Sequence, residues 1–230
     1  YLHGMLACFI APLAANTFHL IFHLLRLALN TRSSTPLYGL STTETVIHSM
    51  LAIGVLSLLV IYFFSLLSKS HAEVLITDYA AAVRRLFLLG LSAAGLIMTT
   101  TGIVNMLHWI MIRLEPAMAI GNFGDVGLAR EAARLIVGLP LWILPWRHTQ
   151  ALLAHPNPSE RQSAMHKLYL GLIVLIATLS TITNAALILT GFIRSMLGLQ
   201  SKGDGRLSLA MMLGMGLIWG YHAVALRNYE

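Results

Sequence analysis

Residues 43–67 read TETVIHSMLAIGVLSLLVIYFFSLL, an apolar run in which Glu44 is the only residue with a full charge. A helix needs about 20 mostly apolar residues to cross the hydrocarbon core of a bilayer. Within lipid, a helix also satisfies all of its own backbone hydrogen bonds, which an irregular segment cannot do. The stretch therefore predicts a transmembrane helix, and the rest of the chain repeats its pattern.

The composition of the whole chain agrees with a membrane protein. Of its 230 residues, 57 % are hydrophobic and only 10 % are charged, whereas a soluble domain carries about 25 % charged residues. So few charges cannot cover a surface that faces water. The composition excludes a secreted domain, a coiled coil and a disordered chain. The net charge of +6 does not indicate nucleic acid, because the basic residues lie at the ends of apolar runs, where they meet lipid headgroups.

We predict an all-α polytopic membrane protein, with residues 1–230 forming a single transmembrane domain. The six predicted spans cover residues 4–29, 43–67, 80–114, 128–152, 161–197 and 206–227. An even number of spans would place both termini on one side. Seven Lys and Arg residues lie toward that side and eight toward the other, which we call side B. This balance leaves the orientation open, because the positive-inside rule needs an asymmetry.

Short segments of the chain recur at a fixed distance. Val83–Phe87 aligns with Met165–Tyr169 at an offset of 82 residues, and Thr99–Thr101 aligns with Thr181–Thr183 at the same offset. Similarity at a fixed period is typical of duplicated structural units. The sequence therefore predicts repeated helix pairs.

The run Ala132–Arg147, AARLIVGLPLWILPWR, combines a Gly-Leu-Pro-x-Trp core with a terminal Trp-Arg. It resembles a recurrent segment in an uncharacterised bacterial family of multipass membrane domains, which are built from repeated helix pairs. The resemblance covers mainly residues 128–200. The second and sixth spans depart from it, because they lack the proline and the Trp-Arg ending. The resemblance implies an architecture and no activity, and it favours a bacterial inner (cytoplasmic) membrane.

Histidines supply the main candidates for chemistry. His19 and His23 are four residues apart, so they share one face of the first helix; His48 begins the second span and His108 ends the third. Topology predicts that His23, His48 and His108 lie at similar depth toward side B. Imidazoles there can ligate haem iron or chlorophyll magnesium, or can bond a quinone carbonyl. The alternative is that they bond helix-end carbonyls or anchor the interface. We expect His71, His155 and His166 to be solvated.

Small and polar residues within the spans are expected to pack helices together, because they allow close approach and hydrogen bonding in lipid. The tryptophans lie mostly near span ends, as in an aromatic belt. The predicted packing residues are Thr99, Thr101, Thr181, Thr183, Asn184, Gly216 and Gly220.

No enzyme motif is present, no metal site is predicted, and no acidic residue lies near the middle of a span. We therefore expect a non-catalytic subunit that packs in and stabilises a larger, energy-transducing membrane complex, respiratory or photosynthetic. Its partners would be the lipid bilayer and other membrane subunits. One alternative is a redox-associated protein that binds haem, chlorophyll or quinone through the side-B histidines. The second is a small helix-pair transporter, for which only Pro12, Pro140 and Pro145 offer breaks in a helix.

Overall fold

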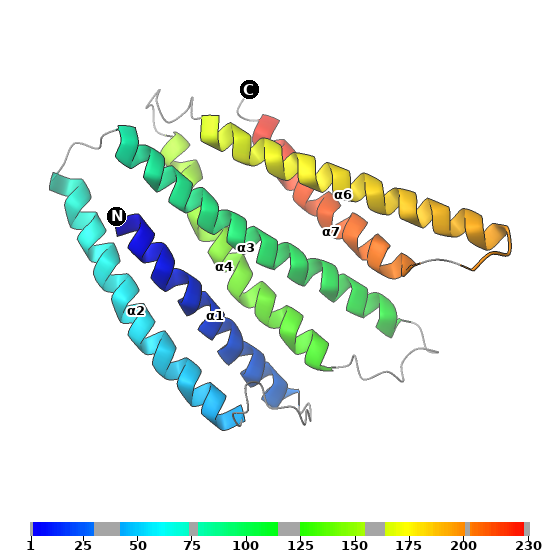
Figure 1. Cartoon of the computed structure of the whole chain (residues 1–230), viewed down its shortest axis with the longest axis horizontal. Coiled ribbons are helices and arrows are strands. Elements are labelled where there is room, and N and C mark those ends of the chain that lie inside the picture. The colour runs from blue at the N-terminus through cyan, green and yellow to red at the C-terminus, as the bar shows by residue number, and fades with distance from the viewer. Residues whose placement is uncertain are drawn as a thin grey trace. The chain divides into compact units, whose positions relative to one another are not determined.

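A computed structural model describes residues 2–29, 42–73, 78–114, 125–154, 164–200 and 203–227. These residues form six α-helices, and within the described ranges there is no strand. Figure 1 shows the helices in chain order. They are α1 (Leu2–Ala28), α2 (Thr42–Glu73), α3 (Asp78–Arg113), α4 (Asp125–Ala154), α6 (Ala164–Met196) and α7 (Gly205–Arg227).

Each of the six predicted runs lies on one of these helices, so the prediction of an all-α polytopic membrane protein is confirmed. Among the described residues, five helices are long and apolar enough to cross a membrane: α1, α2, α3, α6 and α7. The fourth predicted span, α4, is a helix but is not among these five. The reason lies in its first half, where Arg130, Glu131 and Arg134 interrupt the apolar sequence.

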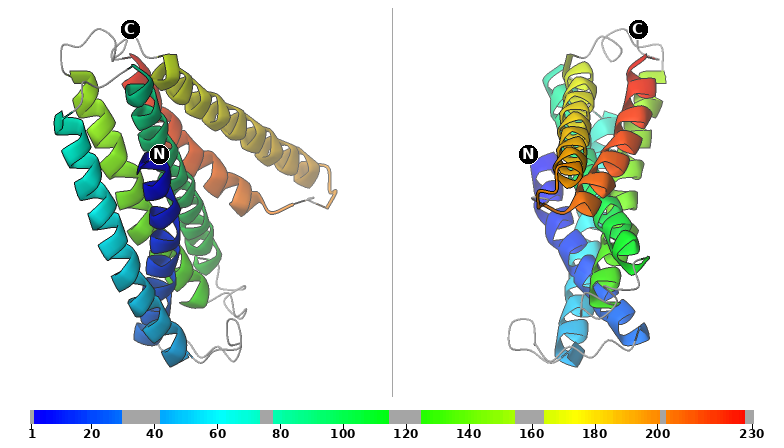
Figure 2. Two further views of the ribbon diagram at one scale, coloured as in Figure 1. Left: turned by 60° about the vertical axis from the view of Figure 1, so that its left-hand side comes forward. Right: turned by 90° about the vertical axis from the view of Figure 1, so that its right-hand side faces the viewer.

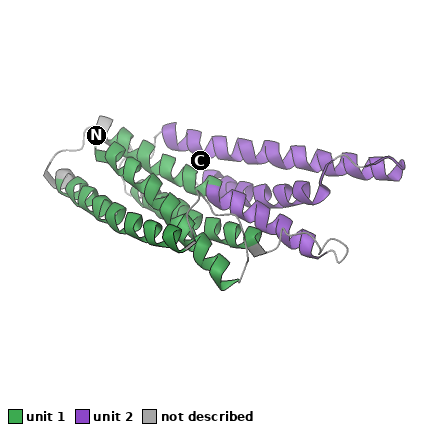
Figure 3. Cartoon of the chain, turned by 60° about the horizontal axis from the view of Figure 1, so that its bottom comes forward, with its two compact units in different colours: residues 1–97, 123–156 green, residues 98–122, 157–230 purple. Residues whose placement is uncertain are grey.

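The described chain groups into two compact units, each drawn in its own colour in Figure 3. Unit 1 contains residues 1–97 and 123–156, and unit 2 contains residues 98–122 and 157–230. The first part of α3 thus belongs to unit 1 and the remainder to unit 2. Whether the units together form the single predicted domain stays a prediction.

Within unit 1, α1 is the central helix. It lies beside α2 in all the views of Figures 1 and 2, and the Phe9 ring stacks on that of Phe63 with their centroids 5.3 Å apart. On another face, Phe22 of α1 packs against Ala129 and Ala133 of α4. Alanines present little side chain, so the α4 backbone can approach the phenylalanine closely.

Within unit 1, α3 approaches α4 closely at Gly95. A Cβ placed on Gly95 would collide with backbone atoms of Leu141 and Trp142. One turn earlier, the buried Ser92 hydroxyl donates a hydrogen bond to the Trp142 carbonyl at 3.5 Å. Gly95 and Ser92 therefore let α3 and α4 pack almost backbone to backbone.

The prolines do not break their helices. Pro12 lies inside the continuous helix α1, and Pro140 and Pro145 lie inside the continuous helix α4. A proline removes one backbone hydrogen bond without necessarily ending a membrane helix, since neighbouring groups compensate. The breaks that a helix-pair transporter would need are thus absent from α1 and α4.

Within unit 2, α6 and α7 form an antiparallel hairpin, drawn side by side in Figure 1. Helix α6 ends because Gly198 adopts a positive φ of 66°. The N–H of Leu199 then bonds the Arg194 carbonyl at 2.9 Å, and that of Gly198 bonds the Ser195 carbonyl at 3.1 Å. This is the Schellman arrangement, which satisfies carbonyls at the end of a helix.

Helix α7 packs on the unit 2 part of α3 through Gly214. A Cβ at Gly214 would lie 2.7 Å from the Val104 Cγ2 atom. At Gly95 the nearest atoms belong to the backbone, whereas at Gly214 the nearest atom belongs to a side chain. The α3–α7 contact is therefore tight but has a branched side chain on its α3 side, and branching at Cβ restricts the rotamers of valine in a helix.

Candidate functional site

His23 is the most enclosed of the predicted site histidines. It lies on α1 beside the Phe22 contact with α4, and only 2 % of its surface is exposed. Its ring packs against that of Phe22, with the centroids 5.3 Å apart. Neither ring nitrogen has a hydrogen-bond partner among the described residues. A buried polar group usually has a partner, so this imidazole is chemically unsatisfied.

His19 and His48 are also in unit 1 but differ from His23 in exposure. His19 is half-buried, and its ring meets that of Phe18 edge-on. His48 is exposed on the first turns of α2. His23 and His48 thus present very different surroundings, although topology predicts a similar depth.

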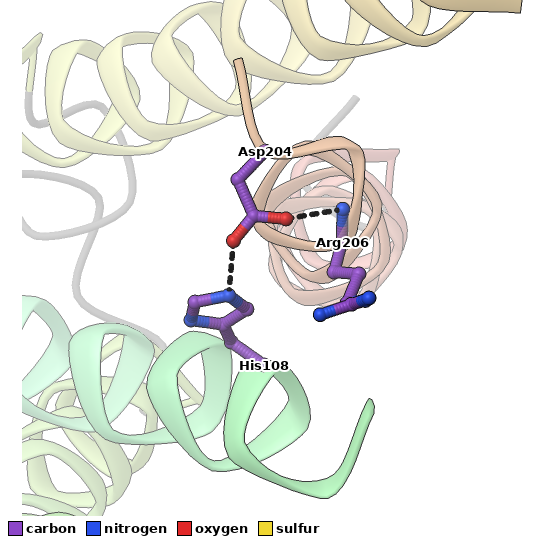
Figure 4. Close-up of polar contacts among 3 residues, drawn as sticks. All are labelled: His108, Asp204 and Arg206. Carbon is purple, nitrogen blue, oxygen red and sulfur yellow. Dashed lines mark hydrogen bonds and ion pairs between the residues drawn. The ribbon is translucent and has the colours of Figure 1, made fainter. Parts of the chain in front are cut away.

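His108 belongs to unit 2 and has a definite partner there. Its Nε2 atom lies 2.7 Å from Oδ2 of Asp204, in the segment just before α7 (Figure 4). The other carboxylate oxygen, Oδ1, accepts the backbone N–H of Arg206 at 3.0 Å. Asp204 is therefore the N-cap of α7, since it satisfies an N–H that has no partner inside the helix.

The pKa of Asp204 lies below its ordinary value. Partial burial acts to raise it, but the hydrogen bond with His108, the N–H of Arg206, the charge of His108 and the N–H of Leu207 together outweigh burial. Each of these contacts favours the ionised carboxylate. Asp204 is thus held as an anion at the end of α3.

Sequence reasoning missed a second pair of charges, in α4. Glu131 is only 6 % exposed, and both of its carboxylate oxygens accept hydrogen bonds from Nη1 of Arg134, at 2.9 and 2.7 Å. The spacing of three residues, with opposite charges on one helix face, is a signal that could have found it. For Asp204 no comparable signal exists, since its partner His108 lies 96 positions away.

Two predictions about burial are wrong. His166 was expected to be solvated, but it lies on the first turn of α6 with 4 % exposure. Trp142 and Trp146 were expected in an aromatic belt, but both are buried. Helix α4 continues through Pro140 and Pro145 and past these tryptophans. Because α3 has a glycine at position 95, it packs against the α4 backbone at Trp142.

The predicted packing residues divide by location. Thr99 is fully buried, whereas Thr101 and Thr183 are exposed. Thr181 and Asn184 are half-buried and donate to carbonyls of their own helix, those of Ala177 and Ser180, each at 2.8 Å.

In unit 2 the close helix contact is at Gly214, while a Cβ at Gly216 or Gly220 would meet nothing within 4 Å. Any packing role of Gly216 and Gly220 therefore involves a surface that the described residues leave open.

Within the described ranges, no three His, Cys, Asp or Glu side chains are arranged to hold a metal ion. His23, with an unsatisfied imidazole, is the residue that best fits a cofactor or a polar ligand. His108 differs, because its Nε2 atom is engaged by Asp204.

Comparison with known proteins identifies a family but no activity. No curated protein and no solved structure matches the chain. A family model described as a domain of unknown function, DUF5671, matches residues 85–221, from α3 to α7. This range is more than half of the chain and includes the Ala132–Arg147 run. The chain is a helical membrane protein that belongs to the DUF5671 family.

Proposed function

We propose that this protein is a non-catalytic subunit that packs in and stabilises a larger membrane complex. The observation that carries the proposal is a set of glycines on apolar helices that no neighbouring described element contacts. A Cβ at Gly54 of α2, or at Gly216 or Gly220 of α7, would meet nothing within 4 Å from the other helices that the structure describes. Glycine inside a helix costs about 0.5–1 kcal/mol relative to alanine. In a membrane helix it brings a gain where a second helix comes close.

Helix α2 gives the same indication along its most apolar stretch. None of the residues in its most apolar window is buried in the chain. Its exposed face includes large side chains such as Leu58, Ile61 and Phe64, each more than 60 % exposed. Lipid alone would cover such a face, but the glycine at position 54 favours a partner helix over part of it.

The test is the size of the particle extracted from native membranes in a mild detergent. We expect the tagged chain to migrate as a complex larger than a monomer, with other membrane proteins identified in it by mass spectrometry. Gly216→Leu combined with Gly220→Leu should reduce the size, because the larger side chains prevent close approach. The matched control is Leu213→Ile with Leu217→Ile, at two exposed positions of the same helix. A particle that contains only this chain, or one unaffected by the glycine variants, would contradict the proposal.

His23 favours a second candidate function, that of a redox-associated protein. A neutral imidazole offers one donor and one acceptor, which fits the carbonyl of a quinone, or a single ligand to haem iron or chlorophyll magnesium. Both nitrogens of His23 lack partners in the described chain. The energy-transducing character of the proposed complex depends on this second candidate.

An absorption spectrum and a lipid extract of the purified chain test this candidate. Haem would give a Soret band that moves on reduction, chlorophyll a band in the far red, and quinone a chromatographic peak in the extract. Each should fall in His23→Ala and persist in His48→Ala, which changes an exposed histidine of the same unit. Preparations that lack all three signals would refute cofactor binding and leave the packing proposal standing.

A further inference from the structure

The contact between His108 and Asp204 joins two helix ends that are far apart in the sequence. His108 is in the last two turns of α3, and Asp204 caps α7. Their side chains are 23 % and 44 % exposed, so the contact is not enclosed by the described chain. Because helix ends of a membrane protein lie toward the interface with water, we expect the contact to be open to protons while it holds the start of the α7 helix.

Contacts within its own turn hold the Asp204 carboxylate in place, independently of His108. Gly203, with a φ of 106°, turns the chain into α7. The Asp204 carbonyl then accepts the N–H of Ser208 at 3.1 Å, while Oδ1 accepts that of Arg206. Because these bonds orient the carboxylate, Oδ2 is directed to His108 without further ordering of a flexible side chain (Figure 4).

The surrounding charges make Asp204 the natural counter-ion of a protonated His108. In the described part of unit 2, Asp204 is the only acidic residue. The cations near these helix ends are Arg206 on α7, Arg113 on α3 and Arg194 on α6. Arg113 stacks on Trp109 at 5.3 Å, and Arg194 donates to the Gln200 carbonyl at 3.1 Å. No other acidic side chain of this described region competes for His108.

A second anchor lies deeper between the same two helices. At Gly214, two and a half turns into α7, the helix packs closely on Val104. This apolar contact does not depend on pH. A change in the His108–Asp204 contact would therefore act on the first turns of α7 while the deeper part stays packed.

We propose that His108 and Asp204 form a pH-sensitive latch, which holds the first turns of α7 to the end of α3 when His108 is protonated and weakens when it is neutral. Histidine is the side chain that changes charge between pH 5 and 8. The protonated ring forms an ion pair with the carboxylate. The neutral ring can donate a hydrogen bond from Nε2 but adds no opposite charge, and hydrogen bonds between ionised groups are stronger.

Hydrogen exchange of the full chain in lipid nanodiscs tests the latch. After correction for intrinsic exchange, amides of residues 205–209 should exchange about two- to fivefold faster near pH 8 than near pH 5.5, the range for a partly exposed ion pair. In His108→Gln and Asp204→Asn the difference should vanish, while asparagine keeps the helix cap. The control His48→Gln removes an exposed histidine of unit 1 and should leave the profile unchanged. A wild-type profile that does not vary with pH, or one that persists in His108→Gln, would overturn the proposal.

A second measurement applies even if one variant is too unstable to purify. In the chain labelled with ¹⁵N-histidine, the His108 signal is assigned as the resonance that His108→Gln or His108→Asn removes. We expect Asp204→Asn to move the chemical shift of the His108 Nε2 atom, because that atom contacts the carboxylate. An unchanged chemical shift would show that Asp204 does not contact the ring, and the latch would be refuted.

Discussion

At Asp204 one carboxylate carries out two tasks, since one oxygen caps α7 and the other contacts His108. Substitutions can separate the two. Asp204→Asn retains an N-cap and removes the charge, whereas Asp204→Ala removes both. We predict that Asp204→Ala costs about 0.5–2 kcal/mol more of unfolding free energy than Asp204→Asn, the range for a lost cap. Thermal unfolding of the two purified variants at neutral pH measures the difference, and equal stabilities would contradict the capping role.

Acid should affect the same residue in a defined direction. The pKa of Asp204 is lowered in the folded chain, so its stabilising contribution is present above the pKa of the unfolded chain. The contribution is lost as the pH falls through the folded-state pKa. We predict that acidification below the unfolded-chain pKa of the Asp204 carboxyl narrows the stability gap between the wild type and Asp204→Asn until the two coincide. A gap that stays constant over this acidic range would exclude this linkage.

Glu131 and Arg134 form the second residue-scale pair, and here burial decides the cost. Removing one partner of a buried ion pair leaves an uncompensated charge, which costs about 3–5 kcal/mol. Because the Arg134 side chain is 28 % exposed and that of Glu131 only 8 %, we predict that Arg134→Met destabilises the chain by about 3 kcal/mol. Adding Glu131→Gln should recover part of this loss. An additive double variant in thermal unfolding would show that the two charges do not interact.

At the scale of helices, the apolar runs predicted the elements well but not the surfaces where they meet. Residues 43–67 are apolar on every side of the helix, so the hydrophobic pattern does not indicate which face packs against a neighbour. The structure leaves α2 largely exposed. The sequence likewise pointed to Gly216 and Gly220, whereas the close contacts occur at Gly95 and Gly214. A glycine looks the same in any helix, and only the path of the neighbouring helix decides whether it is crowded.

Two glycines of α3 allow a matched test of helix packing. At Gly95 an added methyl group would collide with the backbone of Leu141 and Trp142, which cannot rotate away as a side chain can. At Gly90 it would meet nothing within 4 Å. We predict that Gly95→Ala destabilises the chain by about 1–3 kcal/mol, as overpacking does. Gly90→Ala should be neutral or should stabilise it by up to about 1 kcal/mol. Similar unfolding temperatures for the two variants would contradict the close α3–α4 approach.

For the whole molecule, composition and the long apolar runs were enough to identify a helical membrane protein. With only 10 % charged residues, the chain cannot cover a surface that faces water. The candidate sites were less accessible to sequence reasoning. His23 was recognised from its position in a span, but its isolation from polar partners depends on how α1 packs against α4. The Asp204 partner of His108 lies 96 positions away, beyond α4 and α6, and no periodic pattern connects two such positions.

The least apolar helix, α4, decides the topology of the whole chain. It carries four charged residues in its first half, which oppose its insertion as an isolated helix. Glu131 neutralises Arg134, Ala129 and Ala133 pack on α1, and the backbone at Trp142 receives α3. We therefore predict that α4 crosses the membrane as part of unit 1, so that the chain spans six times. Reporters fused to the two termini should then lie on the same side, and one inserted after Gln200 on the other. Termini on opposite sides would mean that α4 does not cross.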